Sequence, residues 1–126
     1  MARILIADDE EPMRALIARA LGEDGHRVVA TADGTEALDL LQSEDGNFDL
    51  LLTDIQMPSM DGIALALAVA RDFPKLPVLL MTGYADQRER ASGLEALIQG
   101  VVTKPFGVAD IKSAVAAAIA KGKRSP

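Results

Sequence analysis

Acidic, hydroxyl and basic side chains follow short apolar runs at four separate places in the chain. The clearest run is Leu50-Leu51-Leu52-Thr53, which leads directly into Asp54 and then into a turn that contains Pro58 and Gly62. The residues at the ends of these runs are Asp8, Asp9, Asp54, Thr82 and Lys104. Each of them alone has a structural explanation, as a strand end, a helix N-terminus or a surface charge. Convergence at one place would give them a chemical role.

Three carboxylates gathered at one site would repel one another and raise one another's pKa. Lys104 can offset part of this repulsion, and a divalent cation can offset the rest. A donor set made only of oxygens, with no histidine or cysteine nearby, favours a hard ion such as Mg²⁺, which keeps several waters and binds few carboxylates. We therefore expect Asp9 and Asp54 as direct ligands, Asp8 as a ligand through water, and the backbone carbonyl of Gln56 as a further ligand.

Such a site suits the transfer of a phosphoryl group to a carboxylate. Asp54 would attack phosphorus and form an aspartyl phosphate. The metal and Lys104 would neutralise charge on the equatorial oxygens, and Thr82 would donate a hydrogen bond to one of them.

This convergence requires a particular arrangement of strands and helices. Apolar runs predict strands at residues 3–7, 27–31, 50–54, 77–82 and 101–103. Apolar residues at helical spacing, with proline or glycine near the ends, predict helices at 12–21, 35–41, 63–73, 87–97 and 108–120. Strands that alternate with helices form a parallel sheet, because each connection is a right-handed crossover. The carboxyl ends of the strands then meet at one edge, where ligands bind in open α/β sheets.

Length and composition limit the classes of protein to consider. The chain has 126 residues, 49% of them hydrophobic and 25% charged, which is typical of one globular domain. It has no cysteine, so it cannot use a disulfide or a thiol nucleophile. A formal net charge of −6 argues against direct binding to DNA. The apolar run at 3–7 is too short for a signal peptide or a membrane span, so we expect a cytoplasmic protein with a domain at 1–121 and a disordered basic tail at 122–126.

Four motifs together resemble the receiver domains of two-component response regulators over essentially the whole chain. They are the pair Asp8-Asp9, the run Asp54-Ile55-Gln56-Met57-Pro58-Ser59-Met60-Asp61-Gly62, the pair Thr82-Gly83, and Lys104-Pro105-Phe106. The resemblance implies a flavodoxin-like (CheY-like) α/β fold in three layers, with five parallel strands in the order 2-1-3-4-5 and five helices. It also implies a cis peptide bond before Pro105.

The same resemblance implies a phosphoacceptor rather than an enzyme that acts on a substrate. A histidine kinase or a histidine phosphotransfer protein would phosphorylate Asp54, and the phosphate would be lost slowly by autodephosphorylation. The only histidine, His26, is far from every motif, so the donor histidine belongs to another protein.

The chain departs from the family pattern at Val101, where relatives usually carry the Tyr or Phe that moves together with the counterpart of Thr82. The usual coupled switch is therefore in doubt. Tyr84, the only tyrosine, has two interpretations. It is either an exposed loop aromatic or a gate that limits access of water to the aspartyl phosphate.

The output is expected to be a change in binding to another protein, biased by phosphorylation. Residues 77–88 and 100–106 look most like those of CpdR-type single-domain regulators, which implies that the unphosphorylated form primes the ClpXP protease for its substrates. A phosphorelay intermediate or phosphate sink in a stress or chemotaxis pathway is an alternative. A Mg²⁺-dependent aspartyl-phosphate phosphatase is more remote, because Asp8-Asp9-Glu10 lacks the D-x-D pattern.

Overall fold

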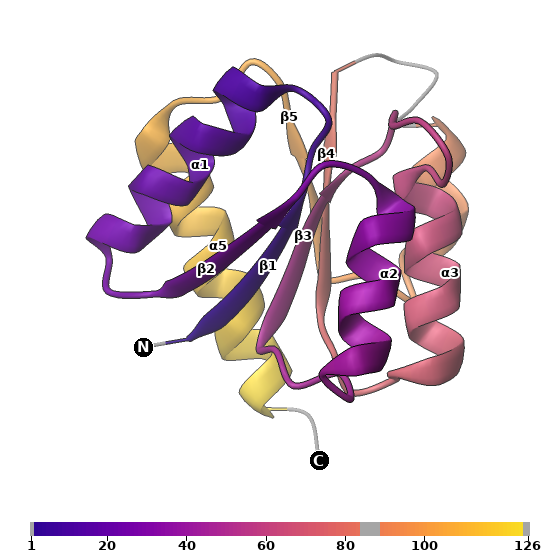
Figure 1. Cartoon of the computed structure of the whole chain (residues 1–126). Coiled ribbons are helices and arrows are strands. Elements are labelled where there is room, and N and C mark those ends of the chain that lie inside the picture. Colours follow the sequence, from indigo (N-terminus) through magenta and orange to yellow (C-terminus); the bar gives the residue numbers. More distant parts are fainter. Residues whose placement is uncertain (1, 84–88, 125–126) are drawn as a thin grey trace.

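Five parallel strands form the central layer of the computed structural model (Figure 1). The strands are β1 (Arg3–Ala7), β2 (Arg27–Thr31), β3 (Leu50–Asp54), β4 (Val78–Thr82) and β5 (Gly100–Thr103). Their order in the sheet is β2-β1-β3-β4-β5, which confirms the expected topology. The structure describes residues 2–83 and 89–124.

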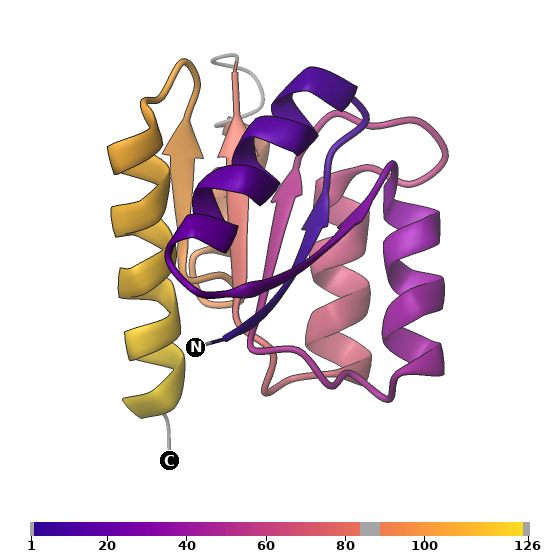
Figure 2. The same cartoon turned by 60° about the vertical axis from the view of Figure 1, so that its left-hand side comes forward.

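Helices cover both faces of this sheet, which confirms the three-layer arrangement (Figures 1 and 2). One face packs against α1 (Glu11–Glu23) and α5 (Val108–Arg124), and the other packs against α2 (Gly34–Ser43) and α3 (Gly62–Asp72). The short 3₁₀ helix η1 (Ser92–Leu94) lies on the face of α2 and α3, where Leu94 contacts the core.

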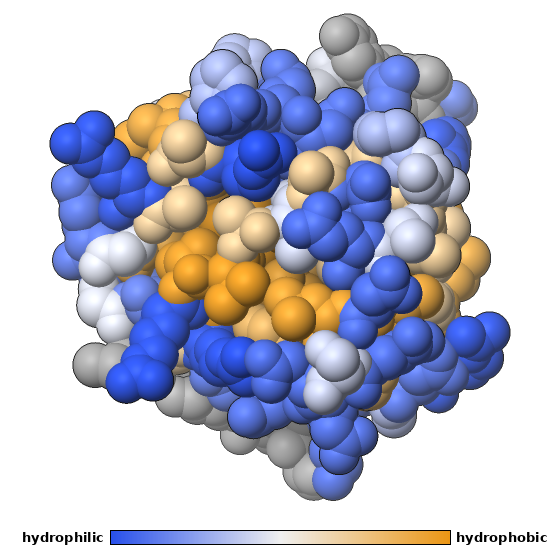
Figure 3. All heavy atoms as spheres, viewed as in Figure 1, coloured by the Kyte–Doolittle hydropathy of each residue, from blue (hydrophilic) through white to orange (hydrophobic). Residues whose placement is uncertain are grey.

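The three central strands are apolar on both faces because helices cover both sides. Along β3, Leu50 and Leu52 pack toward α1 and α5, whereas Leu51 packs toward α2 and α3. All five residues of β3 and of β4 are buried. The edge strand β2 is less covered, and its Val28 and Val29 are only partly buried. Figure 3 shows the corresponding apolar surface between α1 and α2, framed by hydrophilic side chains.

Two helices begin where a loop aspartate caps the first turn. The Asp33 side chain accepts a hydrogen bond from the Glu36 backbone N–H at 2.8 Å, and the Asp61 side chain accepts one from Ala64 at 2.9 Å. The cap at Asp61 starts α3 only a few residues after β3 ends at Asp54. The loop between β3 and α3 is therefore held at the carboxyl edge of the sheet.

Two helices differ from their expected bounds by more than two residues. Of the helix expected at 87–97, residues 89–91 are helical and η1 follows, while residues 87 and 88 lie outside the described residues. The final helix ends at Arg124 rather than at 120, so it includes residues 122–124. The disordered basic tail expected at 122–126 stays a prediction. Gly122 lies inside this helix and packs closely on Pro77, since a Cβ there would lie 2.7 Å from the Pro77 ring. Residues 125 and 126 lie outside the described residues.

The peptide bond between Lys104 and Pro105 is cis, as expected. Among the described residues, none of the helices combines the length and the apolar character needed to cross a membrane.

Candidate functional site

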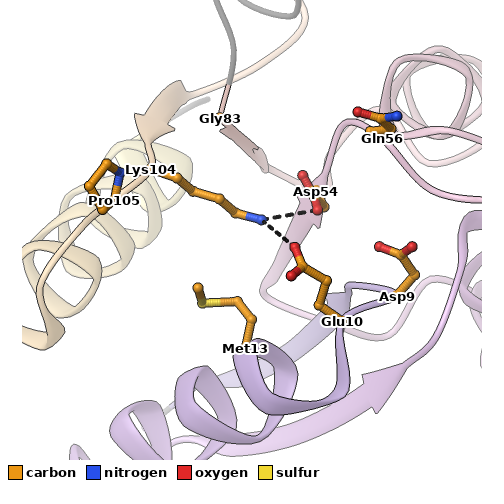
Figure 4. A pocket seen from close by; sticks show the side chains of 8 residues that line it. All are labelled: Asp9, Glu10, Met13, Asp54, Gln56, Gly83, Lys104 and Pro105. Carbon is orange, nitrogen blue, oxygen red and sulfur yellow. Dashed lines mark hydrogen bonds and ion pairs between the residues drawn. The ribbon is translucent and has the colours of Figure 1, made fainter.

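The strand ends meet at one edge of the sheet, as the sequence predicts. The register pairs Asp54 on β3 with Met81 on β4, one residue before Thr82. Asp8 follows β1 directly, and Lys104 follows β5. A pocket of about 470 Å³ opens at this edge (Figure 4). Its lining consists of Asp9, Glu10, Met13, Asp54, Gln56, Gly83, Lys104 and Pro105.

Asp54 is a buried carboxylate that reaches the pocket. Asp54 is only 5% exposed, and its Oδ1 accepts a hydrogen bond from the Ile55 backbone N–H at 2.9 Å. Its Oδ2 accepts a hydrogen bond from the Lys104 Nζ at 3.0 Å. Burial raises the pKa of Asp54 above its ordinary value, although Lys104 opposes this shift. A buried carboxylate with a cation beside it is chemically suited to act as a nucleophile.

Lys104 is the cation shared by the carboxylates at this edge. Its Nζ lies 3.0 Å from Asp54, 3.7 Å from Glu10 and 3.9 Å from Asp8. Burial opposes the charge of the ammonium group, but the hydrogen bond to Asp54 and the surrounding negative charges outweigh burial and raise the pKa of Lys104. Lys104 therefore stays protonated and can face an incoming anion.

Replacing Lys104 by methionine is expected to raise the pKa of both Asp54 and Asp8 further, because both carboxylates lose the charge that favours their ionised form. A ¹³C NMR titration of the aspartate carboxyl groups measures this. The matched control is Lys112→Met, because Lys112 pairs with Glu23 and Asp24, both at 3.5 Å, away from the pocket. Unchanged titration of both carboxyl groups in Lys104→Met would contradict the assigned pairing.

Asp8 has an unsatisfied oxygen inside the cluster. The residue is fully buried, and its Oδ1 accepts a hydrogen bond from the Glu10 backbone N–H at 2.9 Å. Its Oδ2 is buried with no hydrogen-bond partner among the described residues. Burial is the main cause that raises the pKa of Asp8 to about 6, with Asp54 and Glu10 adding to it. An orphaned buried carboxylate oxygen is a costly feature that a bound cation would satisfy.

Carboxylate oxygens of Asp8, Glu10 and Asp54 lie within 4.8 Å of one another. This donor set contains only oxygen, which suits Mg²⁺ rather than a softer metal. Together with the orphaned oxygen of Asp8, the residues present fit the expected cation.

The ligand set expected from the sequence differs from the cluster that the structure brings together. Asp9 lines the pocket and its charge raises the pKa of Asp54, but Asp9 is exposed and is not part of the close cluster. Gln56 also lines the pocket. Sequence reasoning missed Glu10, which we had no basis to separate from its acidic neighbours at a helix N-terminus. The roles of Asp9 and Gln56 as ligands stay predictions.

Neither Thr82 nor Val101, the two positions of the family's coupled switch, is among the described residues that line the pocket. Thr82 ends β4 at the correct edge and is fully buried, while the next residue, Gly83, lines the pocket. Val101 is 39% exposed on β5 and lines a separate hollow of about 370 Å³ with Ala91 and Ile98. Tyr84 lies outside the described residues, so both interpretations of it stay open.

Comparison with protein families and curated proteins agrees with this geometry. Residues 4–116 match the model of the response regulator receiver domain. The chain is 41% identical to the chemotaxis protein CheY of Pseudomonas aeruginosa, covering 90% of this chain and 92% of that protein. It is 38% identical to the response regulator receiver protein CpdR of Brucella abortus, covering 88% and 91%. Over 86% of this chain, it is 35% identical to the transcriptional regulatory protein TcrA of Mycobacterium tuberculosis, of which it spans 42%.

Solved structures show the same fold. A response regulator receiver domain protein from Clostridium thermocellum superposes with a TM-score of 0.88 at 26% identity, covering 98% of both chains. The response regulator TrrA of Thermotoga maritima, solved in complex with Mg²⁺ and BeF, superposes with a TM-score of 0.80 at 30% identity. That match covers 92% of this chain and 97% of TrrA.

Proposed function

The chain belongs to the response regulator receiver domain family, and on this basis we propose that Asp54 accepts a phosphoryl group from a phosphohistidine of a partner protein. An oxygen of the Asp54 carboxylate attacks phosphorus, the P–N bond to the imidazole breaks, and the imidazole leaves as the acyl phosphate forms. The observation that carries the proposal is the 3.0 Å contact between Lys104 and the buried Asp54 at the edge where the acidic cluster lies.

The surrounding residues have distinct roles in this transfer. Lys104 neutralises charge on the phosphoryl oxygens and keeps its own proton. Asp8, Asp9, Asp54 and the backbone of Gln56 would hold Mg²⁺, which, when bound, supplies charge neutralisation to the transferring group. Thr82, at the end of β4, donates a hydrogen bond to a phosphoryl oxygen.

Incubation of the whole chain with acetyl phosphate and Mg²⁺ is expected to add one acid-stable, base-labile phosphate per molecule. Mass spectrometry of the intact chain and of its peptides should place this phosphate on Asp54. The Asp54→Asn variant is expected to take up none, because the amide is not a nucleophile. The control Asp33→Asn, which changes a helix cap away from the pocket, should be phosphorylated like the wild type.

Two results would reject this function. Phosphate on a residue other than Asp54 would reject the assigned nucleophile. Release of many equivalents of inorganic phosphate per chain would indicate the alternative, a Mg²⁺-dependent phosphatase that uses an aspartyl phosphate.

For the output, we propose phosphorylation-dependent binding to another protein in the cytoplasm. The support is that this chain covers nearly the full length of CheY and CpdR, 92% and 91% respectively. The similarity to CpdR makes ClpXP, or a ClpXP substrate, our candidate partner, with a phosphorelay intermediate as the alternative. Measuring the binding of the phosphorylated and unphosphorylated chain to purified ClpXP tests this candidate. Equal binding of both forms, or binding of neither, would reject it.

A further inference from the structure

Glu10 extends from the start of α1 toward the ammonium group of Lys104, whereas the neighbouring Asp9 side chain lies apart from that group (Figure 4). The Oε1 of Glu10 lies 3.7 Å from the Lys104 Nζ, and a carboxylate oxygen of Glu10 belongs to the close cluster with Asp8 and Asp54. Glu10 therefore approaches both the cation of the protein and the carboxylates around it.

This position of Glu10 is not explained by a role in helix capping. Glu10 is the N-cap residue of α1, but its side chain makes no capping hydrogen bond. Its backbone N–H instead donates to the Oδ1 of Asp8, which ties Glu10 to the fully buried carboxylate. The Glu10 side chain is 65% exposed, so it can turn without disturbing the core.

We propose that Glu10 is an exchangeable carboxylate that pairs with Lys104 in the metal-free protein and turns to a bound divalent cation beside Asp8 and Asp54. This inference rests on the proposed function, because it assigns a further residue to the same site. By turning away, Glu10 removes one competitor for Lys104 and leaves the ammonium group available to the phosphoryl group.

The charges at the site support this exchange. Three carboxylates and one ammonium group give the cluster a net negative charge, and Asp9 in the same pocket adds to it, so a divalent cation would offset charge that the protein leaves unbalanced. The Oδ2 of the fully buried Asp8 has no hydrogen-bond partner in the described part of the chain, and the Lys104 Nζ lies 3.9 Å from it. A bound cation would supply the close partner that this oxygen lacks. Because the three carboxylates already lie within 4.8 Å of one another, Glu10 needs only a side-chain rotation to join them around one ion.

Isothermal titration of Mg²⁺ into the whole chain tests the proposal without any phosphodonor. The Glu10→Gln variant keeps the size of the side chain and removes its charge, and we expect it to bind Mg²⁺ about 10-fold more weakly than the wild type. The matched control is Glu11→Gln, which makes the same change in charge at the next residue, an exposed position outside the pocket lining. We expect this control to bind like the wild type.

Unchanged Mg²⁺ affinity in Glu10→Gln would overturn the inference, as would equal weakening in both variants, which would indicate only the general charge of the helix start. A wild-type chain that binds no Mg²⁺ would also overturn it. If Mg²⁺ binding depends on Glu10 but Asp54 takes up no phosphate from acetyl phosphate, the proposed function fails and the role of Glu10 in the metal site stands.

Discussion

Asp8→Asn is expected to stabilise the fold at pH 7 without divalent cations, by about 1 to 3 kcal/mol. The folded protein raises the pKa of the fully buried Asp8 from 3.8 to about 6. Between these two pH values the folded state binds more protons than the unfolded state, so this carboxyl group lowers stability progressively as pH rises. Above about pH 6 its full cost is present. Asparagine has a similar shape, can still accept the Glu10 N–H, and does not carry the charge.

Urea unfolding in EDTA at pH 5 and at pH 7.5 measures this effect. Asp8→Asn should unfold at a higher urea concentration than the wild type at pH 7.5, and the difference should shrink at pH 5. Asp39→Asn is a suitable control, because Asp39 is an exposed aspartate on α2 and its loss should change little. Added Mg²⁺ should stabilise the wild type more than Asp8→Asn. A destabilised variant, or an equal gain at both pH values, would contradict the assigned cost.

The order of the elements was predictable because their signals are local. Apolar runs identify β1, β3 and β4, since strands covered on both faces need no polar positions. Proline in the first turn of α1 and glycine after β3 mark boundaries that the structure confirms to within a few residues. Parallel topology then placed Asp8, Asp54 and Lys104 at one edge without any knowledge of side-chain contacts.

Sequence patterns did not predict those features of the site and of the helix ends that depend on contacts between distant parts of the chain. The sequence Asp8-Asp9-Glu10-Glu11 shows four similar acids, and it cannot tell which of them faces Lys104. That depends on how the start of α1 is placed relative to Lys104, which follows β5 near the other end of the chain. Gly122 is a similar case, because glycine is typical of helix ends, yet this glycine lies inside α5 to let the helix approach Pro77.

A second large effect is expected from Gly62→Ala, which should destabilise the fold by about 3 kcal/mol or more. Gly62 is the first residue of α3, and its N–H donates to the Ile55 carbonyl at 2.7 Å. A Cβ at this position would overlap the backbone carbonyl oxygen of Asp54 and lie 2.9 Å from the Cα of Ile55. Both obstacles are backbone atoms next to a fully buried strand, so they cannot move aside as a flexible side chain could.

Gly22→Ala is the matched control, because Gly22 lies within α1 and a Cβ there would meet nothing within 4 Å. The free energy of unfolding of that variant should rise by about 0.5 to 1 kcal/mol, because alanine has a better helix propensity than glycine. Equilibrium urea unfolding of both variants measures the contrast, and equal midpoints for Gly62→Ala and the wild type would show that α3 and β3 are not in the contact described. Because the overlap falls on the carbonyl group of Asp54 itself, it is relieved either by moving α3 or by shifting the Asp54 backbone, and the second shift also displaces the Asp54 carboxylate. Folded Gly62→Ala protein should therefore take up phosphate from acetyl phosphate more slowly than Gly22→Ala.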